Sequence, residues 1–119
     1  DRLPPEENNS CPAKVAAILR DFPEMTVIAA HMGGYLHWRY ALEHLVGKNV
    51  YIDTSSTLAF IDDDTLQRIF DGHPRERILF GSDYPLFDPG EEIARLRKRL
   101  RLRDAELEQI LSAGAALLR

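Results

Sequence analysis

Three short runs rich in apolar residues constrain the fold of this chain more than any other feature. They lie near residues 26–30, 49–53 and 77–80, and segments with helical apolar spacing separate them. Apolar runs of this length are typical of strands in a parallel sheet that is covered on both faces. Since helices alternate with these strands, we expect parallel pairing through right-handed crossovers. The sequence therefore predicts an α/β fold of three parallel strands in a single domain over residues 1–119.

End signals and apolar spacing place the helices around these strands. Ser10 is the predicted N-cap of the first helix and Pro23 ends it, while Asp62, Glu91 and Asp104 mark the starts of later helices. Residues 113–118 are predicted to form a separate short helix at the end of the chain. The side chains expected to pack inward are Val15, Ile18, Leu19, Phe22, Trp38, Ala41, Leu42, Leu45, Leu66, Ile69, Phe70, Ile93, Leu96, Leu100, Leu107, Ile110 and Leu111.

Composition excludes several classes of partner. The net charge of −4 argues against nucleic acid and anionic membranes, and no apolar run approaches the roughly 20 residues of a membrane helix. The basic residues over 95–103 lie on a predicted amphipathic helix and are expected to face solvent. The single cysteine, Cys11, rules out an internal disulfide and favours a reducing compartment. The first seven residues lack the apolar region of a secretory signal. We therefore expect a cytoplasmic protein.

Residues with chemical potential follow each predicted strand. His31 comes after the first strand and before two glycines, Asp53 and Ser55 lie at the end of the second, and Asp83 follows the third. Because the carboxyl ends of parallel strands meet at one edge of a sheet, these side chains are expected to lie together. By position alone, His31 is either a metal ligand or a hydrogen-bonded residue at a strand end. Asp83 is either a metal-bound carboxylate or a turn cap.

The pattern also ranks the remaining candidates. A free aspartate has a pKa of about 3.9 and is a weak base, so a catalytic role for Asp83 predicts a metal. Asp53 is assigned a structural role more readily than a catalytic one on pattern alone. The residues expected to be solvent-facing or inert are His37, His44, His73 and Cys11.

Three segments together resemble a known family. They are Phe-Pro-Glu-Met-Thr-Val-Ile-Ala-Ala-His-Met-Gly-Gly at 22–34, Asn-Val-Tyr-Ile-Asp-Thr-Ser at 49–55 and Arg-Ile-Leu-Phe-Gly-Ser-Asp-Tyr-Pro at 77–85. In order and spacing they resemble the amidohydrolase-related family, which includes aminocarboxymuconate semialdehyde decarboxylase and related metal-dependent hydrolases and decarboxylases. The resemblance covers about residues 12–118. It implies a (β/α)8 TIM barrel, of which this chain is the C-terminal part, with one divalent metal, usually zinc.

The resemblance also assigns roles to individual residues. It implies that Asp83 binds the metal and relays protons, and that His31 contacts the reactive water or the substrate, or binds a second metal. Asp53 and Ser55 match substrate-facing positions. The expected reaction is attack of a metal-activated water on the carbonyl carbon of a small-molecule substrate, with His31 orienting that water or stabilising oxyanion charge.

Two departures from the family pattern bear on this expectation. The family's metal site also uses a His-x-His pair and a further histidine, but this sequence has no His-x-His and no histidine before His31. Ala115 occupies the position of a family asparagine before the last helix. We therefore do not expect a tight metal site in the 119-residue chain alone.

A second hypothesis is a non-catalytic half-barrel or small α/β domain. A full barrel needs roughly 250 residues, so this chain would leave sheet edges and an interior face uncovered. Such surfaces favour association with a second copy or with the missing half of the barrel. A nucleic-acid-binding role for the basic helix is a distant third hypothesis.

Overall fold

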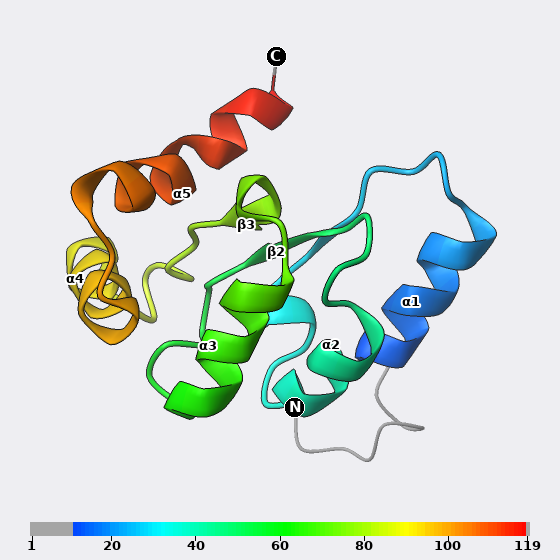
Figure 1. Ribbon diagram of the computed structural model, residues 1–119, viewed down its shortest axis with the longest axis horizontal. Coiled ribbons are helices and arrows are strands. Elements are labelled where there is room, and N and C mark those ends of the chain that lie inside the picture. Colours follow the sequence, from blue (N-terminus) through cyan, green and yellow to red (C-terminus); the bar gives the residue numbers. More distant parts are fainter. Residues whose placement is uncertain (1–10, 119) are drawn as a thin grey trace.

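A computed structural model describes residues 11–118 and contains a three-stranded parallel sheet with helices packed along it (Figure 1). The strands are β1 (Ile28–Ala29), β2 (Tyr51–Asp53) and β3 (Ile78–Leu79), in the order β1-β2-β3. Both pairs are parallel, which confirms the predicted α/β architecture. The regular ladders are shorter than the predicted runs, although flanking residues add backbone hydrogen bonds from Tyr51 N–H to the Val27 carbonyl and from Thr54 N–H to the Leu79 carbonyl.

The register of the sheet separates a buried face from an open one. Ile52 pairs with Ile78, and these two side chains are 1% and 0% exposed on the face that the helices cover. Ile28 pairs with Tyr51 on the opposite face and is 53% exposed. The prediction that the first strand is covered on both faces is therefore wrong. The described chain leaves this face uncovered at β1, whereas Leu79 of β3, on the same face, is 8% exposed.

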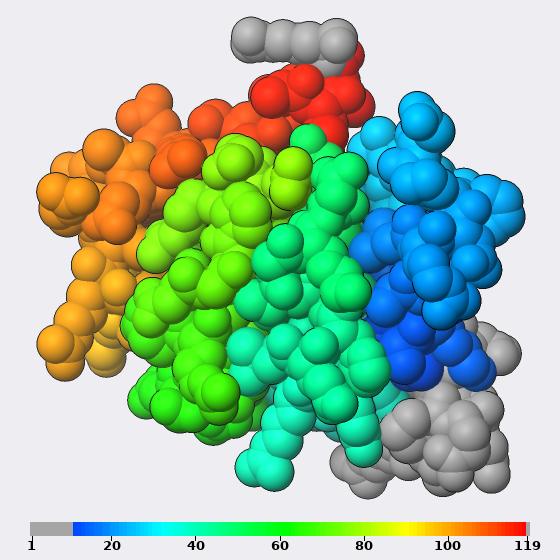
Figure 2. All heavy atoms as spheres, turned by 45° about the vertical axis from the view of Figure 1, so that its right-hand side comes forward, coloured from blue at the N-terminus to red at the C-terminus, as the bar shows by residue number. Residues whose placement is uncertain are grey.

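Five α-helices lie within residues 11–118 and pack around the sheet. They are α1 (Pro12–Asp21), α2 (Trp38–His44), α3 (Asp63–Gly72), α4 (Pro89–Leu100) and α5 (Asp104–Leu117). In Figure 1, α1 to α4 succeed one another from right to left, and α5 lies beside β3. Figure 2 shows the same succession on the outer surface, where segments adjacent in sequence lie side by side. Within residues 11–118, no helix is long and apolar enough to cross a membrane.

The core lies between the helices and the covered face of the sheet. It is built from aliphatic and aromatic side chains of every helix from α2 to α5 together with those of the strands. The largest fully buried side chains are Phe70, Met32, Leu45, Ile52, Leu58, Leu66, Ile69, Ile78, Leu96 and Ile110.

The helix starts were predicted with mixed success. Asp62 caps α3 as expected, since its carboxylate accepts a hydrogen bond from the backbone N–H of Thr65 at 2.9 Å, and this bond lowers the pKa of the Asp62 carboxyl. The fourth helix begins before Glu91, because Asp88 accepts from the Glu91 N–H and provides an earlier cap. Asp104 is not the cap of α5 but its first helical residue. The predicted cap Ser10 lies outside the described residues.

The C-terminal part of the chain differs from its prediction. Residues 113–118 do not form a separate helix, because α5 continues without a break to Leu117. Leu111 is 41% exposed rather than packed inward, since α5 has only Leu107 and Ile110 buried in the core. On α1, Ile18 is likewise 42% exposed. Apolar spacing alone therefore overestimates how much of these helices the described chain covers.

His73 is buried, which corrects the prediction of a surface turn residue. Its side chain is 4% exposed at the end of α3. Its Nδ1 accepts a hydrogen bond from the backbone N–H of Gly47 at 3.1 Å, and its Nε2 lies 2.8 Å from the carbonyl of Val50. The imidazole therefore ties the loop between α2 and β2 to the end of α3. Burial lowers the pKa of His73 below 6.5, although the bond to Val50 opposes this effect.

We expect His73 to make the fold sensitive to mild acid. Because its pKa is lower in the folded chain, the unfolded chain binds more protons just below pH 6.5. The stabilisation is thus complete above about pH 6.5 and is lost as the pH falls through the folded pKa. His73→Gln should lower the free energy of unfolding by about 1–3 kcal/mol at about pH 8 and flatten its decline in acid, measured by urea denaturation. His44→Gln, on α2, is the control and should leave both quantities close to those of the parent chain. An unchanged acid decline in His73→Gln would contradict the prediction.

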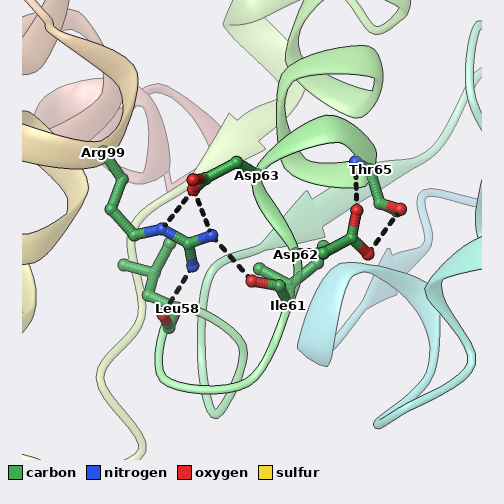
Figure 3. A network of polar contacts seen from close by, with 6 residues as sticks. All are labelled: Leu58, Ile61, Asp62, Asp63, Thr65 and Arg99. Carbon is green, nitrogen blue, oxygen red and sulfur yellow. Dashed lines mark hydrogen bonds and ion pairs between the residues drawn. The ribbon is translucent and has the colours of Figure 1, made fainter.

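Arg99 joins α4 to the loop before α3, although the sequence placed it on a solvent-facing basic helix. Its guanidinium donates to the carbonyls of Leu58 and Ile61, each at 2.7 Å, and to the carboxylate of Asp63 (Figure 3). Its side chain is only 19% exposed. Three acceptors around one planar group use the fork geometry that lysine lacks.

We expect Arg99→Lys to lower the free energy of unfolding by about 1–3 kcal/mol, because one ammonium cannot serve all three acceptors. Arg101→Lys is the matched control: Arg101 is exposed, and no residue within 11–118 pairs with it. It should change stability by no more than about 0.5 kcal/mol. Equal effects of the two substitutions in urea denaturation would show that the network around Arg99 adds no stability.

Candidate functional site

One cavity at the carboxyl edge of the sheet brings together two of the predicted site residues. It has a volume of about 860 Å³, and both His31 and Asp83 line it. His31 follows β1 and Asp83 follows β3, so parallel pairing carries them to the same edge of the sheet. Ser56 lies on the same wall. The cavity therefore combines an imidazole, a carboxylate and a hydroxyl.

Hydrogen bonds from the end of β2 fix the position of His31. Its Nδ1 lies 3.0 Å from the carbonyl oxygen of Ser55 and 2.9 Å from the hydroxyl oxygen of the same residue. Its backbone N–H donates to Asp53 at 2.9 Å, and its carbonyl accepts from the indole of Trp38 at 3.0 Å. The ring and the backbone of His31 are thus both held by neighbouring residues.

Asp53 and Ser55 face His31 rather than the cavity lining. One oxygen of Asp53, Oδ1, accepts from the N–H of His31, the N–H of Ser55 and the hydroxyl of Ser55. Ser55 is 6% exposed, and neither residue belongs to the lining of the cavity. Their assignment as substrate-binding residues stays a prediction, while their observed contacts serve His31.

Asp83 is held by Ser56, a residue that was not among the predicted site residues. The Ser56 hydroxyl donates to Oδ2 of Asp83 at 2.5 Å. Thr54 fixes the backbone two residues before Asp83. Its hydroxyl donates to the Gly81 carbonyl at 3.0 Å and accepts from the Gly81 N–H at 3.1 Å. The run of hydroxyl residues after Asp53 was the available signal for Ser56. The sequence could not show that Ser56 contacts Asp83, which follows a different strand.

Left-handed backbone geometry gathers around this cavity. His31, Met32, Ser56 and Asp83 have φ values of 57°, 54°, 46° and 59°. Such values are uncommon for residues other than glycine and cost roughly 1–3 kcal/mol each unless the surroundings stabilise them. Their concentration at the strand ends indicates a functional constraint on this edge.

Aromatic side chains form part of the cavity wall. Tyr35 contacts the ring of His31 edge-on at 6.2 Å and the ring of Phe60 at 5.8 Å, and Phe60 contacts Phe87 at 6.1 Å. All of these side chains line the cavity. A mainly apolar wall with a few polar groups at one end is typical of small-molecule sites. Tyr35, Phe60 and Phe87 lie outside the strand-end motifs, so no pattern in the sequence marked them.

Gly33 allows the chain to turn from His31 into α2. Its φ is 98°, and a Cβ at this position would lie 2.5 Å from Cδ1 of Leu45. Gly114 is the opposite case, because a Cβ there would meet nothing within 4 Å inside α5. The backbone and packing therefore require glycine at position 33, whereas position 114 has room for a side chain.

We expect Gly33→Ala to lower the free energy of unfolding by about 2 kcal/mol or more, through backbone strain and overpacking. Gly114→Ala should raise it by about 0.5–1 kcal/mol, because alanine is the better residue inside a helix. Chemical denaturation of both variants measures this difference. A neutral Gly33→Ala variant would show that the turn after His31 adapts freely.

The metal-ligating capacity of the described chain is partial. Within residues 11–118, no group of three or more histidine, cysteine, aspartate or glutamate side chains is arranged to hold a metal ion. His31 and Asp83 offer one nitrogen and one carboxylate on a shared cavity, whereas catalytic zinc sites use three protein ligands. The residues present fit part of a divalent-metal site and not a complete one.

Comparison with known proteins identifies the family. A family model described as amidohydrolase matches residues 8–118. The chain belongs to the amidohydrolase family. No curated protein matches the chain. The family assignment confirms the resemblance carried by the three strand-end segments.

Solved structures of the same family share the fold. An amidohydrolase from Burkholderia multivorans with bound zinc is 17% identical with a TM-score of 0.69, over 89% of this chain and 48% of its own. A dihydroxybenzoic acid decarboxylase from Polaromonas sp. JS666, with bound manganese and the inhibitor 2-nitroresorcinol, is 18% identical with a TM-score of 0.62. It is matched over 89% of this chain and 38% of its own. A 2,6-dihydroxybenzoate decarboxylase from Rhizobium is 20% identical with a TM-score of 0.60, over 87% and 38%.

These matches show the architecture of the chain. It spans less than half the length of each of these structures. The three parallel strands and their helices form part of a TIM barrel, as the sequence predicted.

Proposed function

We propose that this chain forms the C-terminal portion of a metal-dependent hydrolase or decarboxylase that acts on a carbonyl-type small molecule. The observation that carries this proposal is the placement of His31 and Asp83, from two different strand ends, on one cavity. The family assignment and the zinc and manganese in related structures support a divalent metal, with zinc as the first candidate. The single cysteine supports a cytoplasmic location.

The side chains of this cavity suit the proposed chemistry. A divalent metal, when bound, polarises a carbonyl group and lowers the pKa of water. Ser56 occupies Oδ2 of Asp83, and Oδ1 has no hydrogen-bond partner within residues 11–118. This oxygen can hold the metal or accept a proton. His31 supplies a nitrogen for the metal or for the substrate, and the aromatic side chains of the lining provide an apolar surface for the substrate.

The remaining ligands must come from outside the described residues. His31 and Asp83 are two donors, and the chain spans less than half of the related structures. The edge of β1 is a surface on which further strands would continue the sheet, and they would also border the exposed face at Ile28. We propose that the missing barrel half, or a second copy, associates there.

We expect the isolated chain to retain less than one equivalent of zinc or manganese after dialysis, measured by elemental analysis. Two donors do not make a tight site. In a longer protein that contains the whole barrel, one equivalent should bind. Asp83→Ala there should weaken metal affinity by at least about 10-fold, because removing a ligand costs more than disturbing its neighbours. Ser112→Ala, at an exposed position of α5, is the control. Stoichiometric, tight metal in the isolated chain would contradict the proposed division of ligands.

A second candidate is a non-catalytic domain that assembles through its open sheet. The absence of a three-ligand cluster within residues 11–118, together with 53% exposure of Ile28, favours it. Metal content and oligomeric mass of the same sample discriminate between the two. The assembly role would be favoured if the isolated chain forms a stable oligomer that binds no metal and the whole barrel has no activity.

A further inference from the structure

We propose that Asp53 and Ser55 are positioning residues that hold neutral His31 with its proton on Nδ1, leaving the lone pair of Nε2 for the cavity. The contact geometry stands on its own, and only the use of that lone pair rests on the proposed function. A histidine nitrogen binds a metal or accepts a proton only when it carries no hydrogen. Which nitrogen is bare therefore decides what His31 can do.

Two oxygen atoms of Ser55 face Nδ1 of His31, and both are acceptors. The Ser55 carbonyl oxygen, at 3.0 Å, can only accept. The Ser55 hydroxyl has a single hydrogen, which it donates to Oδ1 of Asp53 at 2.5 Å. Its oxygen, 2.9 Å from Nδ1, is then left as an acceptor. A bare Nδ1 would face two oxygen lone pairs, so Nδ1 carries the proton.

The other ring nitrogen has the opposite surroundings. No residue within 11–118 forms a hydrogen bond with Nε2, and the His31 ring lines the cavity of about 860 Å³. Metal-binding histidines commonly donate their second N–H to a carboxylate or backbone carbonyl, which fixes the ring. Ser55 provides the carbonyl here, and its hydroxyl links the ring to the Asp53 carboxylate.

Asp53 couples the ring to the backbone of His31. Its Oδ1 accepts from the N–H of His31 at 2.9 Å and from the N–H of Ser55 at 3.0 Å. The same oxygen thus holds the left-handed backbone of His31, with φ of 57°, and orients the hydroxyl that faces its ring. Backbone position and proton position are set by one carboxylate.

His73 is an internal reference with the opposite tautomer. Its Nδ1 accepts the Gly47 N–H, so that nitrogen is bare, and its Nε2 donates to the Val50 carbonyl. The chain has four histidines, and therefore few ring signals to assign. One spectrum can then compare the two tautomers in the same protein.

Long-range ¹H–¹⁵N correlation spectra of the chain test this proposal at about pH 8, above the ordinary histidine pKa of about 6.5. His31→Asn identifies the His31 signals, since asparagine tolerates left-handed backbone. The expected result is Nδ1–H for His31 and Nε2–H for His73. A His31 ring with its proton on Nε2 would overturn the proposal.

Substitution of Ser55 tests the positioning role itself. Ser55→Ala removes one of the two acceptors at Nδ1 and should lower the ratio of the Nδ1–H to the Nε2–H tautomer about fivefold, the effect of one ordinary hydrogen bond. Ser56→Ala is the matched control, because its hydroxyl contacts Asp83 and not His31. An unchanged ratio in Ser55→Ala would show that the hydroxyl does not position the ring.

The His73 signals report whether each variant is folded. If Ser55→Ala loses them, Ser55→Cys replaces it, because a thiol of similar size is a weaker hydrogen-bonding group and should shift the ratio in the same direction. Failure of this test leaves the proposed function open, since metal content of the whole barrel decides that separately. Conversely, the expected tautomer in a protein without metal or activity would reject only the proposed function.

Discussion

Parallel pairing of β1, β2 and β3 is the constraint on which the site depends. It delivers the residues after each strand to one edge, so that His31, Asp53 and Asp83 meet although they are far apart in sequence. Side-chain hydrogen bonds then add further links between the ends of these short strands. Thr54 links the end of β2 to Gly81 beyond β3, and Asp53 links β2 to the residue after β1. The sheet edge is therefore a polar network laid across three strands.

This network also accounts for the unusual backbone at the edge. Left-handed conformations occur at His31, Ser56 and Asp83, the residues whose imidazole, hydroxyl and carboxylate line the cavity. Each is paired with a compensating contact: Asp53 accepts from the backbone of His31, and Asp83 accepts from the hydroxyl of Ser56. Backbone strain persists only where the surroundings over-determine it. Here the compensation and the strain come from the same few residues.

The sequence predicted what local pattern and strand order determine. Apolar runs located the strands, Asp62 was identified as a cap, and the strand order brought His31 and Asp83 to one edge, where both line the same cavity. Burial of His73 was missed because its partners lie on other segments of the chain. Exposure of Ile28 and Leu111 was missed because apolar spacing records which face is suited to burial, not whether a partner is present. The aromatic wall was missed because loop residues such as Phe60 follow no period.

Two requirements of the candidate site, the orientation of His31 and the completion of a metal centre, depend on different lengths of chain. The contacts that orient His31 come from Asp53 and Ser55, at the end of the neighbouring strand, and from Trp38, all of which lie within the described chain. Completing a metal centre needs three or more donors converging from several strands of a closed barrel, and residues 11–118 offer two. Preorganisation of a single ligand is thus a local property of adjacent parallel strands, whereas coordination is a property of the whole barrel. A chain that spans less than half of its structural relatives can therefore fix the position of His31 and still offer only two possible metal donors on the cavity.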